Sequence, residues 1–315
     1  MTPPILFIIL PCYNEQAALP ITSKRLAALT DDMIDRTIIA PQSRVVLVDD
    51  GSKDATWQVI SELHAADARF EGVKLAHNAG HMNALWAGKT LAQGRCDFVI
   101  SIDADLQDDP DAMYGFLEEY KKGADVVYGV RSSREKDTFF KRATAQGFYR
   151  LMGRMGAELV YNHADYRLLS ARALEALLSF GEVNMFLRGM VPMLGFRTAQ
   201  VYYERGERVA GESKYPLKKM LAFAMEGVTS LSNRPIRYVL LLGVLCALLG
   251  VAMGVYTLIS FFRGHSVKGW ASTMMSIWLL GGLQLVALGV IGEYIGKIYM
   301  ETKRRPKFIL EEHLK

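Results

Sequence analysis

Two long apolar runs dominate the pattern of hydrophobic and polar positions near the C-terminal end of this chain. Residues 238–262 contain no charged side chain, and neither do residues 271–292. A helix needs about 20 apolar residues to cross the roughly 30 Å hydrocarbon core of a bilayer, and each run meets that length. Because a buried core helix rarely stays apolar on every face for so long, the pattern predicts two transmembrane helices. Only residues 263–270 separate the runs, so we expect a helical hairpin.

Basic residues flank the predicted hairpin unevenly. The connecting loop holds two of them, whereas the two flanks together hold seven: Arg234, Arg237, Lys297, Lys303, Arg304, Arg305 and Lys307. The positive-inside rule then places both ends of the hairpin in the cytoplasm. The first apolar run, residues 5–10, follows no positive charge and does not resemble a secretory signal. We therefore expect a multi-pass membrane protein with a cytosolic domain (residues 1–232), a membrane hairpin (233–296) and a basic cytoplasmic tail (297–315).

Short β-type runs alternate with helical patterns before the hairpin, which is typical of an α/β domain with a mostly parallel, Rossmann-like sheet. Strands are expected at residues 5–10, 44–48, 72–75, 97–102 and 124–127. Helices are expected at residues 16–29, 55–66, 80–93 and 111–121. In such sheets ligands bind beyond the carboxyl ends of the strands. The polar signals of this chain fall at that edge.

Three of the predicted strands end in carboxylates. The first is followed by Glu15, the second by Asp49 and Asp50, and the fourth by Asp103 and Asp105. Like charges brought to one edge repel each other unless a cation or the donors of a ligand compensate them. The spacing of Asp103 and Asp105 turns both side chains toward one side, and hard oxygen ligands of this kind suit Mg²⁺ or Mn²⁺ bound to phosphate oxygens.

Cysteine usage and charge narrow the class of protein. The three cysteines are widely scattered, as expected for free thiols in a reducing compartment. The net charge of +4 is modest, and the basic excess lies near the apolar half, where an anionic leaflet would attract it. Nucleic acid is therefore excluded as an expected partner.

Seven ordered motifs carry a resemblance to a known family. They are PCYNE from Pro11, VDDGSKDAT from Val48, HNAGHMNAL from His77, DADLQDDPD from Asp103, GVR from Gly129, ADYRLLS from Ala164 and RVAGESKYPLKK from Arg208. Together with the hairpin they resemble the family 2 glycosyltransferases of GT-A fold, and among these the polyprenyl-phosphate sugar transferases. The resemblance covers nearly the whole chain. It implies a metal-dependent hexosyltransferase of a bacterial inner membrane that moves a sugar, with inversion, from a nucleotide sugar to undecaprenyl or another polyprenyl phosphate for cell-envelope glycosylation.

The resemblance also assigns site residues. Donor contacts fall on Pro11, Tyr13, Glu15, Val48, Asp50, Asp103, Ala104, Asp105 and Gln107, of which Asp103, Asp105 and Gln107 also hold Mg²⁺ or Mn²⁺. Phosphate groups of donor or acceptor fall to Arg131, Arg208 and Lys214. The catalytic groups are Asp165, Arg131 and Arg167. Two readings stay open: Asp165 is a base or orients a neighbouring cation, and Arg167 acts on substrate or is the ion-pair partner of Asp165.

Two departures from the family pattern leave the donor open. His81 stands where many relatives have Lys, and Asp108-Asp109-Pro110 stands where many have Asp-Pro-Pro. UDP-glucose is the favoured donor, with UDP-N-acetylglucosamine, another UDP-sugar and GDP-mannose behind it.

Membrane contact and assembly add further expectations. Residues 138–160 and 215–231 mix apolar and basic residues, as interfacial helices do, although either segment would also suit packing on the sheet. Residues 206–215 are expected to form a loop that closes over substrates. Small residues in the second apolar run favour close helix packing and hence a homo-oligomer, such as a tetramer.

Three other functions compete with this one. A processive polysaccharide synthase shares the acidic motifs, but it usually carries a Gln-x-x-Arg-Trp motif and more membrane spans than this sequence shows. Transfer to a membrane diacylglycerol is a second alternative. A non-catalytic protein that binds a nucleotide sugar is a third, and the retention of Asp103 and Asp105 argues against it.

Overall fold

A mixed sheet forms the centre of the N-terminal part in this computed structural model, which describes residues 2–132, 163–204, 206, 234–263 and 269–315. The strands in these ranges are β1 (Leu6–Cys12), β2 (Arg44–Asp49), β3 (Phe70–Leu75), β4 (Phe98–Ser101), β5 (Val126–Arg131), β6 (His163–Ser170), β7 (Thr198–Tyr203) and β8 (Leu310–Leu314). Their order is β7-β5-β6-β4-β1-β2-β3-β8. All neighbours pair in parallel except β6, which is antiparallel to β4 and β5, and β8, which is antiparallel to β3. The mostly parallel sheet expected from the sequence is confirmed.

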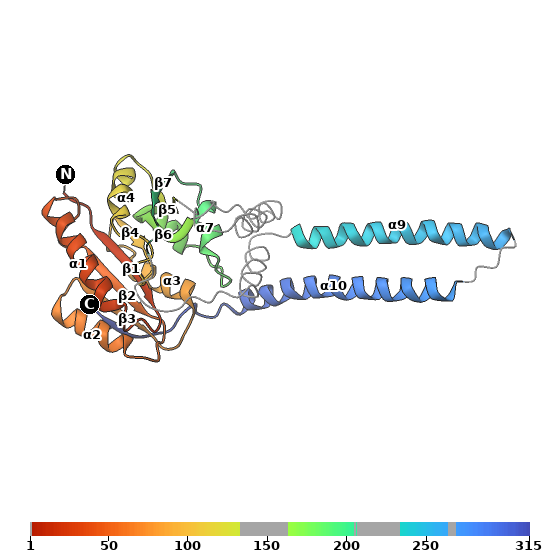
Figure 1. Cartoon of the computed structure of the whole chain (residues 1–315), viewed down its shortest axis with the longest axis horizontal. Coiled ribbons are helices and arrows are strands. Elements are labelled where there is room, and N and C mark those ends of the chain that lie inside the picture. The colour runs from red at the N-terminus through yellow and green to blue at the C-terminus, as the bar shows by residue number, and fades with distance from the viewer. Residues whose placement is uncertain (1, 133–162, 205, 207–233, 264–268) are drawn as a thin grey trace.

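Helices cover both faces of this sheet, so its central strands are apolar on both sides. One face packs on α1 (Leu19–Asp35), α2 (Thr56–Ala66) and α4 (Ala112–Lys121), and the other on α3 (His81–Ala92), α6 (Ala171–Leu178) and α7 (Leu187–Met193) (Figure 1). Successive residues of β1 point to opposite faces of the sheet: Ile8 belongs to the hydrophobic core beneath α1, α2 and α4, and Ile9 to the core beneath α3, α6 and α7. The result is a three-layer α/β/α domain.

The antiparallel strand β6 brings Asp165 close to the acidic residues that follow β4. Because β6 runs against β4, its first residues lie at the carboxyl end of β4, with Ser101 opposite Arg167. The Ser101 hydroxyl donates to the carbonyl oxygen of Asp165 at 2.8 Å. Asp165 is thereby brought to the edge at which Asp103 follows β4.

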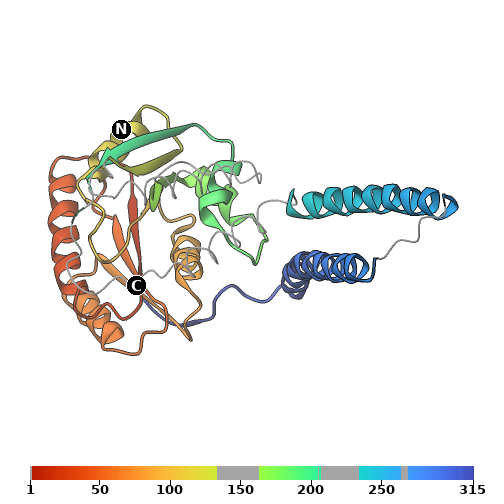
Figure 2. The ribbon, with the colours of Figure 1, turned by 45° about the vertical axis from the view of Figure 1, so that its right-hand side comes forward.

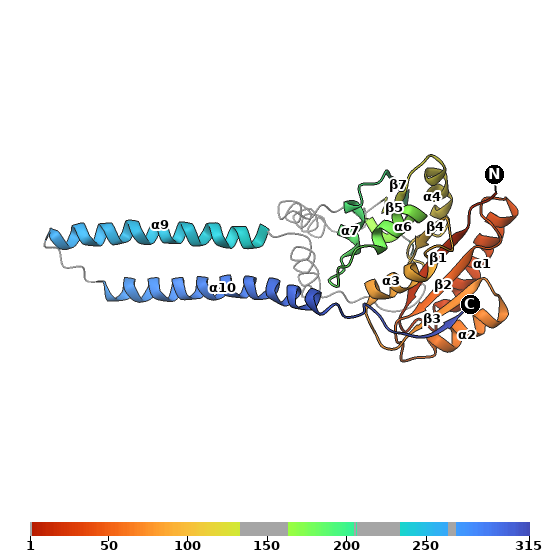
Figure 3. The same cartoon turned by 180° about the vertical axis from the view of Figure 1, so that it is seen from behind.

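Two long helices extend from the domain side by side as a hairpin, α9 (Arg234–Phe262) and α10 (Trp270–Lys303) (Figures 1 and 3). Among the described residues, Leu279–Lys303 is long and apolar enough to cross a membrane, and none of it is buried within the protein. The described large apolar side chains of both helices are largely exposed, including Leu245, Val251 and Leu285. An exposed apolar surface of this extent marks a membrane or protein interaction face.

The last residues return to the domain. The segment expected to be a basic tail first continues α10 to Lys303 and then forms β8, where His313 pairs with Val73 of β3 (Figure 2). The Lys74 ammonium lies 2.8 Å from the Glu311 carboxylate across this pair. The sheet therefore includes residues beyond the predicted domain boundary at 232.

Several predicted features lie outside the described residues. They are the interfacial helices at 138–160 and 215–231, the loop at 207–215, and the phosphate-binding candidates Arg208 and Lys214. Of the predicted loop only Gly206 is described, and its backbone N–H donates to the carbonyl oxygen of Gln107 at 2.9 Å.

Candidate active site

Two carboxylates follow β4 at the carboxyl edge of the sheet. The Asp103 side chain is 41% exposed, and the surrounding protein raises its pKa to about 6. The main cause is partial desolvation of the carboxylate. His81 lowers this pKa, and the charges of nearby carboxylates raise it further. Asp105 accepts a 3.2 Å hydrogen bond from the backbone N–H of Gln107. Leu106, between Asp105 and Gln107, adopts a left-handed conformation with φ +50°, which is uncommon for a bulky residue and is found at functional turns. The acidic motif is therefore a tight, outward-facing turn.

The chemistry of this turn fits a divalent cation. Within the described part of the chain, no group of three or more His, Cys, Asp or Glu side chains is placed to hold a metal ion. Mg²⁺ is commonly bound through one or two carboxylates plus substrate phosphates rather than by a cage of protein ligands. Asp165, Asp108 and Asp105 all raise the pKa of Asp103, so the carboxylates repel one another at this position and a cation bound to Asp103 would relieve that repulsion. Asp103 and Asp105 suit that role once a diphosphate supplies further oxygens.

Asp165 is held by basic side chains from three elements. Its carboxylate oxygens lie 2.6 Å from Arg167 on β6, 3.0 Å from Arg188 on α7 and 3.7 Å from His81 at the start of α3. Burial by itself would raise the pKa of Asp165, but these neighbours, Arg188 foremost, hold that pKa well below its usual range. A carboxylate this acidic is a poor proton acceptor, so the arrangement favours the orienting role for Asp165 over the base role.

Arg167 and Arg188 differ in what they can reach. The Arg167 side chain is 1% exposed, and its second guanidinium nitrogen donates to the carbonyl oxygen of Leu187 at 3.2 Å. Arg167 is thus an ion-pair partner of Asp165, and its predicted catalytic role stays a prediction. Arg188 is 32% exposed beside the same carboxylate, so its guanidinium is accessible to a ligand. Sequence reasoning missed Arg188, since no motif or predicted element marked residues 186–189.

His81 links the two acidic positions. Its Nε2 atom lies 3.8 Å from an Asp103 oxygen and 3.7 Å from an Asp165 oxygen. Asp50 positions the start of α3, because its carboxylate accepts hydrogen bonds from the backbone N–H groups of Ala79 at 2.7 Å and Gly80 at 3.0 Å. Asp50 is itself buried, and burial raises its pKa. Its predicted nucleoside contact stays a prediction.

Arg131 reaches the same edge but is engaged by the acidic loop. Both its Nε and one terminal nitrogen donate to one oxygen of Asp108, at 3.0 and 2.9 Å. The Tyr203 hydroxyl donates to that same oxygen at 2.6 Å. Asp108, which directly follows Gln107, thus fixes the loop that carries Asp105 to β5 and β7. The predicted phosphate contact of Arg131 stays a prediction.

The remaining predicted donor contacts lie along the neighbouring strand ends. Tyr13 is exposed, whereas Pro11, Val48 and Ala104 are buried, and Ala104 belongs to the hydrophobic core. The loop after β1 is joined to the loop after β2, since the Asn14 N–H donates to the Ser52 hydroxyl at 3.0 Å, and the Glu15 N–H donates to the hydroxyl of Thr56 at the start of α2 at 2.9 Å. The sheet therefore brings the carboxyl ends of β1, β2 and β4 and the beginning of β6 to one edge, as expected from the three acidic strand ends.

Comparison with known families places this site in context. Residues 7–178, which include Asp50, Asp103 and Asp165, match the family described as "Glycosyl transferase family 2". The chain belongs to this family. Residues 234–298 match a second family, "GtrB C-terminal hairpin", which coincides with α9 and most of α10. The domain is accordingly a GT-A glycosyltransferase domain followed by a C-terminal hairpin, as the resemblance implied.

Similar proteins match this glycosyltransferase along nearly its whole length. "Uncharacterized glycosyltransferase YkoT" of Bacillus subtilis is 52% identical over 98% of this chain and 91% of its own. "Bactoprenol glucosyl transferase" of Shigella phage SfV is 36% identical over 96% of this chain and 97% of its own. Glucosyl-3-phosphoglycerate synthase from Mycobacterium tuberculosis resembles it in structure, with TM-score 0.47 and 17% identity over 72% of this chain and 79% of that one. A likeness at that level bears on neither substrate nor mechanism.

Proposed function

We propose that this glycosyltransferase moves a hexose, with UDP-glucose as the favoured donor, to the phosphate of a polyprenyl lipid at the cytoplasmic face of a bacterial inner membrane. The observation that carries the proposal is the full-length match to a bactoprenol glucosyl transferase, which extends through both the acidic site and the hairpin. A hairpin with exposed apolar helices supports a lipid acceptor, because it would hold the site near the bilayer surface.

The donor half of the reaction rests on the acidic turn. Asp103 and Asp105 would hold Mg²⁺ or Mn²⁺, with Gln107 beside them. Such an ion supplies positive charge to the diphosphate as negative charge develops on the leaving group. Tyr13 is exposed at the end of β1 and so can contact the nucleoside. The joined loops after β1 and β2 keep that surface in one position for the donor.

The acceptor half requires little proton transfer. A phosphate monoester has a second pKa near 6 and is mostly dianionic at neutral pH, so it can attack the anomeric carbon without a general base. That fits the low pKa of Asp165. Asp165 instead orients Arg188, whose accessible guanidinium is suited to an anionic acceptor. Attack opposite the leaving diphosphate inverts the anomeric carbon, so an α-linked donor gives a β-linked lipid sugar. Arg131, Arg208 and Lys214 remain proposed phosphate contacts.

The proposal is tested by direct sugar transfer. Purified full-length protein is incubated with polyprenyl phosphate, Mg²⁺ or Mn²⁺, and each of several radiolabelled nucleotide sugars. Label should become extractable into organic solvent, most strongly from UDP-glucose, and chelation should abolish the transfer. Asp105→Asn serves as the paired sample, because a neutral amide is a poorer ligand for a hard cation. Transfer to diacylglycerol, formation of a polymer, or nucleotide-sugar binding without transfer would each replace this function with one of its alternatives.

A further inference from the structure

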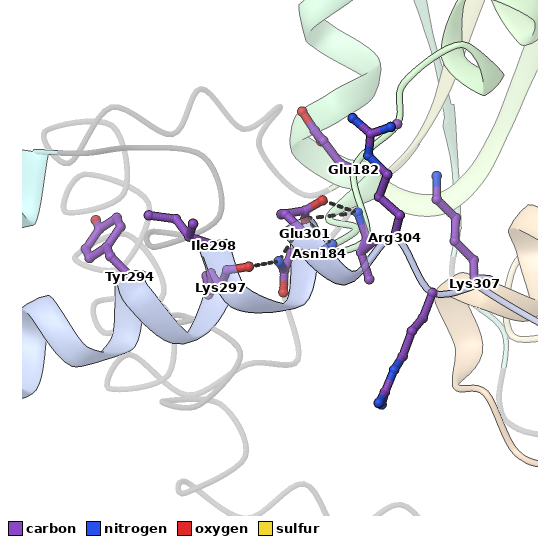
Figure 4. A pocket seen from close by; sticks show the side chains of 11 residues that line it. Glu182, Asn184, Tyr294, Lys297, Ile298, Glu301, Arg304 and Lys307 are labelled. Atoms are coloured by element: carbon purple, nitrogen blue, oxygen red, sulfur yellow. Dashed lines mark hydrogen bonds between the residues drawn. The ribbon is translucent and has the colours of Figure 1, made fainter.

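A cavity of about 780 Å³ lies where the end of α10 meets residues 181–184 of the catalytic domain (Figure 4). Its size is in the range of small-molecule sites. None of the predicted donor or catalytic residues lines it. The lining residues are Gly181, Glu182, Val183, Asn184, Tyr294, Lys297, Ile298, Glu301, Arg304, Arg305 and Lys307.

The cavity carries a surplus of positive charge. Four of its residues are Lys or Arg and two are Glu, which leaves a formal charge of +2. One of the two carboxylates already has partners: Glu301 accepts hydrogen bonds of 2.8 Å from the backbone N–H groups of Val183 and Asn184 and from the Asn184 side chain. The basic side chains therefore dominate the field that a ligand would meet.

Local contacts and backbone conformation fix the positions of two of the basic residues, Lys307 and Arg304. The Lys307 ammonium donates to the carbonyl oxygen of Phe180 at 3.1 Å and lies 3.5 Å from the centre of the Trp86 ring. Its burial lowers its pKa, as expected for a cation that lacks full solvation. Arg304 ends α10 in a left-handed conformation with φ +47°, beyond which the chain turns away from the helix and toward the domain (Figure 4).

The position of the cavity indicates the kind of anion. It adjoins the last turns of the stretch Leu279–Lys303, which is apolar enough to cross a membrane. Tyr294 lines it, and Tyr is enriched at the level of lipid headgroups. Basic pockets beside membrane helices bind the headgroups of anionic lipids. At that level a membrane phospholipid presents a phosphodiester, the anionic group that such a basic cavity can bind.

We propose that this cavity binds the phosphodiester headgroup of an anionic membrane phospholipid. The inference rests on the membrane placement in the proposed function, but not on the sugar that is transferred or on its acceptor. A bound headgroup would join the end of α10 to residues 181–184, and so attach the catalytic domain to one leaflet.

The test measures lipid binding to full-length protein in mild detergent by native mass spectrometry. The probes are short-chain phosphatidylglycerol, short-chain phosphatidylcholine, inorganic phosphate and a short polyprenyl phosphate. Phosphatidylglycerol should bind saturably, and Arg304→Gln with Arg305→Gln should weaken it about 30-fold, since each basic residue near a lipid surface contributes roughly 5-fold. Lys303→Gln with Lys315→Gln is the matched control, because it removes the same charge from two exposed residues that do not line the cavity.

Four outcomes would overturn the site. They are equal weakening in the control pair, equal affinity for phosphatidylcholine, equal affinity for inorganic phosphate, and displacement of phosphatidylglycerol by polyprenyl phosphate at equal concentration. If the double variant fails to fold, Arg305→Gln alone should still weaken binding about 5-fold. A protein that binds phosphatidylglycerol in this way but makes no lipid-linked sugar would refute the proposed function and leave the site intact.

Discussion

Arg188 is an accessible arginine beside Asp165, and its substitution distinguishes a role in sugar transfer from a purely structural ion pair. Arg188→Gln keeps most of the side-chain volume but removes the 3.0 Å charged contact with Asp165. Loss of a hydrogen bond to a charged group costs roughly 1.5–3 kcal/mol, so we expect transfer to fall about 10- to 150-fold at saturating donor.

A matched control for Arg188→Gln is Arg172→Gln, because Arg172 also pairs with an aspartate, Asp125, but follows the other end of β6. Initial rates of sugar transfer are measured for both variants over a range of acceptor concentrations, and only Arg188→Gln should lose activity. Equal losses in the two variants would remove Arg188 from the reaction.

Lys89 gives the domain a pH-dependent stability. It is fully buried on α3, and burial, together with the charge of Arg167, lowers its pKa from 10.5 to about 7. Between those two pH values the unfolded chain binds one more proton than the folded protein, so the free energy of unfolding should rise with pH, by up to about 1.4 kcal/mol per pH unit. Thermal unfolding of the protein in detergent between pH 7 and 9 measures this rise.

The variant Lys89→Met should abolish that pH dependence and be more stable than the parent protein at pH 7, because Met fills the space without a buried charge. Lys24→Met, at an exposed position of α1, is the control and should leave the slope unchanged. A wild-type unfolding midpoint that does not rise from pH 7 to pH 9 would contradict the assignment.

At the scale of elements, α10 is connected to the active site through one short segment. Glu301 holds residues 183 and 184, and only a few residues later Leu187 and Arg188 contact Arg167 and Asp165. We therefore expect Glu301→Gln to loosen this segment, because charge-assisted hydrogen bonds become neutral ones. Amide hydrogen exchange of residues 180–190 should accelerate, and sugar transfer should slow.

Glu293→Gln provides the control for this change, since Glu293 is an exposed residue of the same helix and the substitution alters charge identically. Unchanged exchange in Glu301→Gln, or the same acceleration in both variants, would show that α10 does not hold the segment.

The elements that the sequence predicted are those with strong hydrophobic patterns. β1, β2 and β4 are nearly continuous apolar runs because helices cover both faces, and the helices from α1 to α4 show clear periodicity. β6 was missed as a strand since Asp165 and Arg167 interrupt its pattern, and their burial is compensated by their mutual ion pair and by partners from other elements. β7 is an edge strand and β8 is mostly polar, so neither shows the pattern of a core strand.

Only the part of the candidate site that lies in local sequence motifs could be predicted from the sequence. Carboxylates at strand ends identified Asp103 and Asp105, because parallel strands place their carboxyl ends together. Arg188 and the role of Asp108 depend on contacts between elements far apart in the chain, which no local pattern encodes.

At the scale of the whole molecule, the hairpin offers a surface for assembly. Gly282 and Gly289 are exposed and seven residues apart on α10, and among the described residues no atom beyond the helix's own adjacent backbone lies within 4 Å of where a side chain would begin at either position. Small residues repeated on one helix face allow close approach of another helix, so we expect a homo-oligomer in the membrane. Native mass measurement in mild detergent should detect it, and Gly282→Leu with Gly289→Leu should shift the protein toward monomer. A strictly monomeric active enzyme would exclude this assembly.

The return of the chain to β3 means that the catalytic domain's sheet includes a strand that comes after the C-terminal hairpin. A soluble fragment that stops before α9 would lack β8 and leave the N–H and C=O groups of β3 open to other chains. Such a fragment should aggregate, whereas one that joins residue 232 to residue 306 through a short flexible linker should stay monodisperse on gel filtration. For the same reason a purification tag belongs at the N-terminus, because a fusion after Lys315 begins directly beside an edge strand.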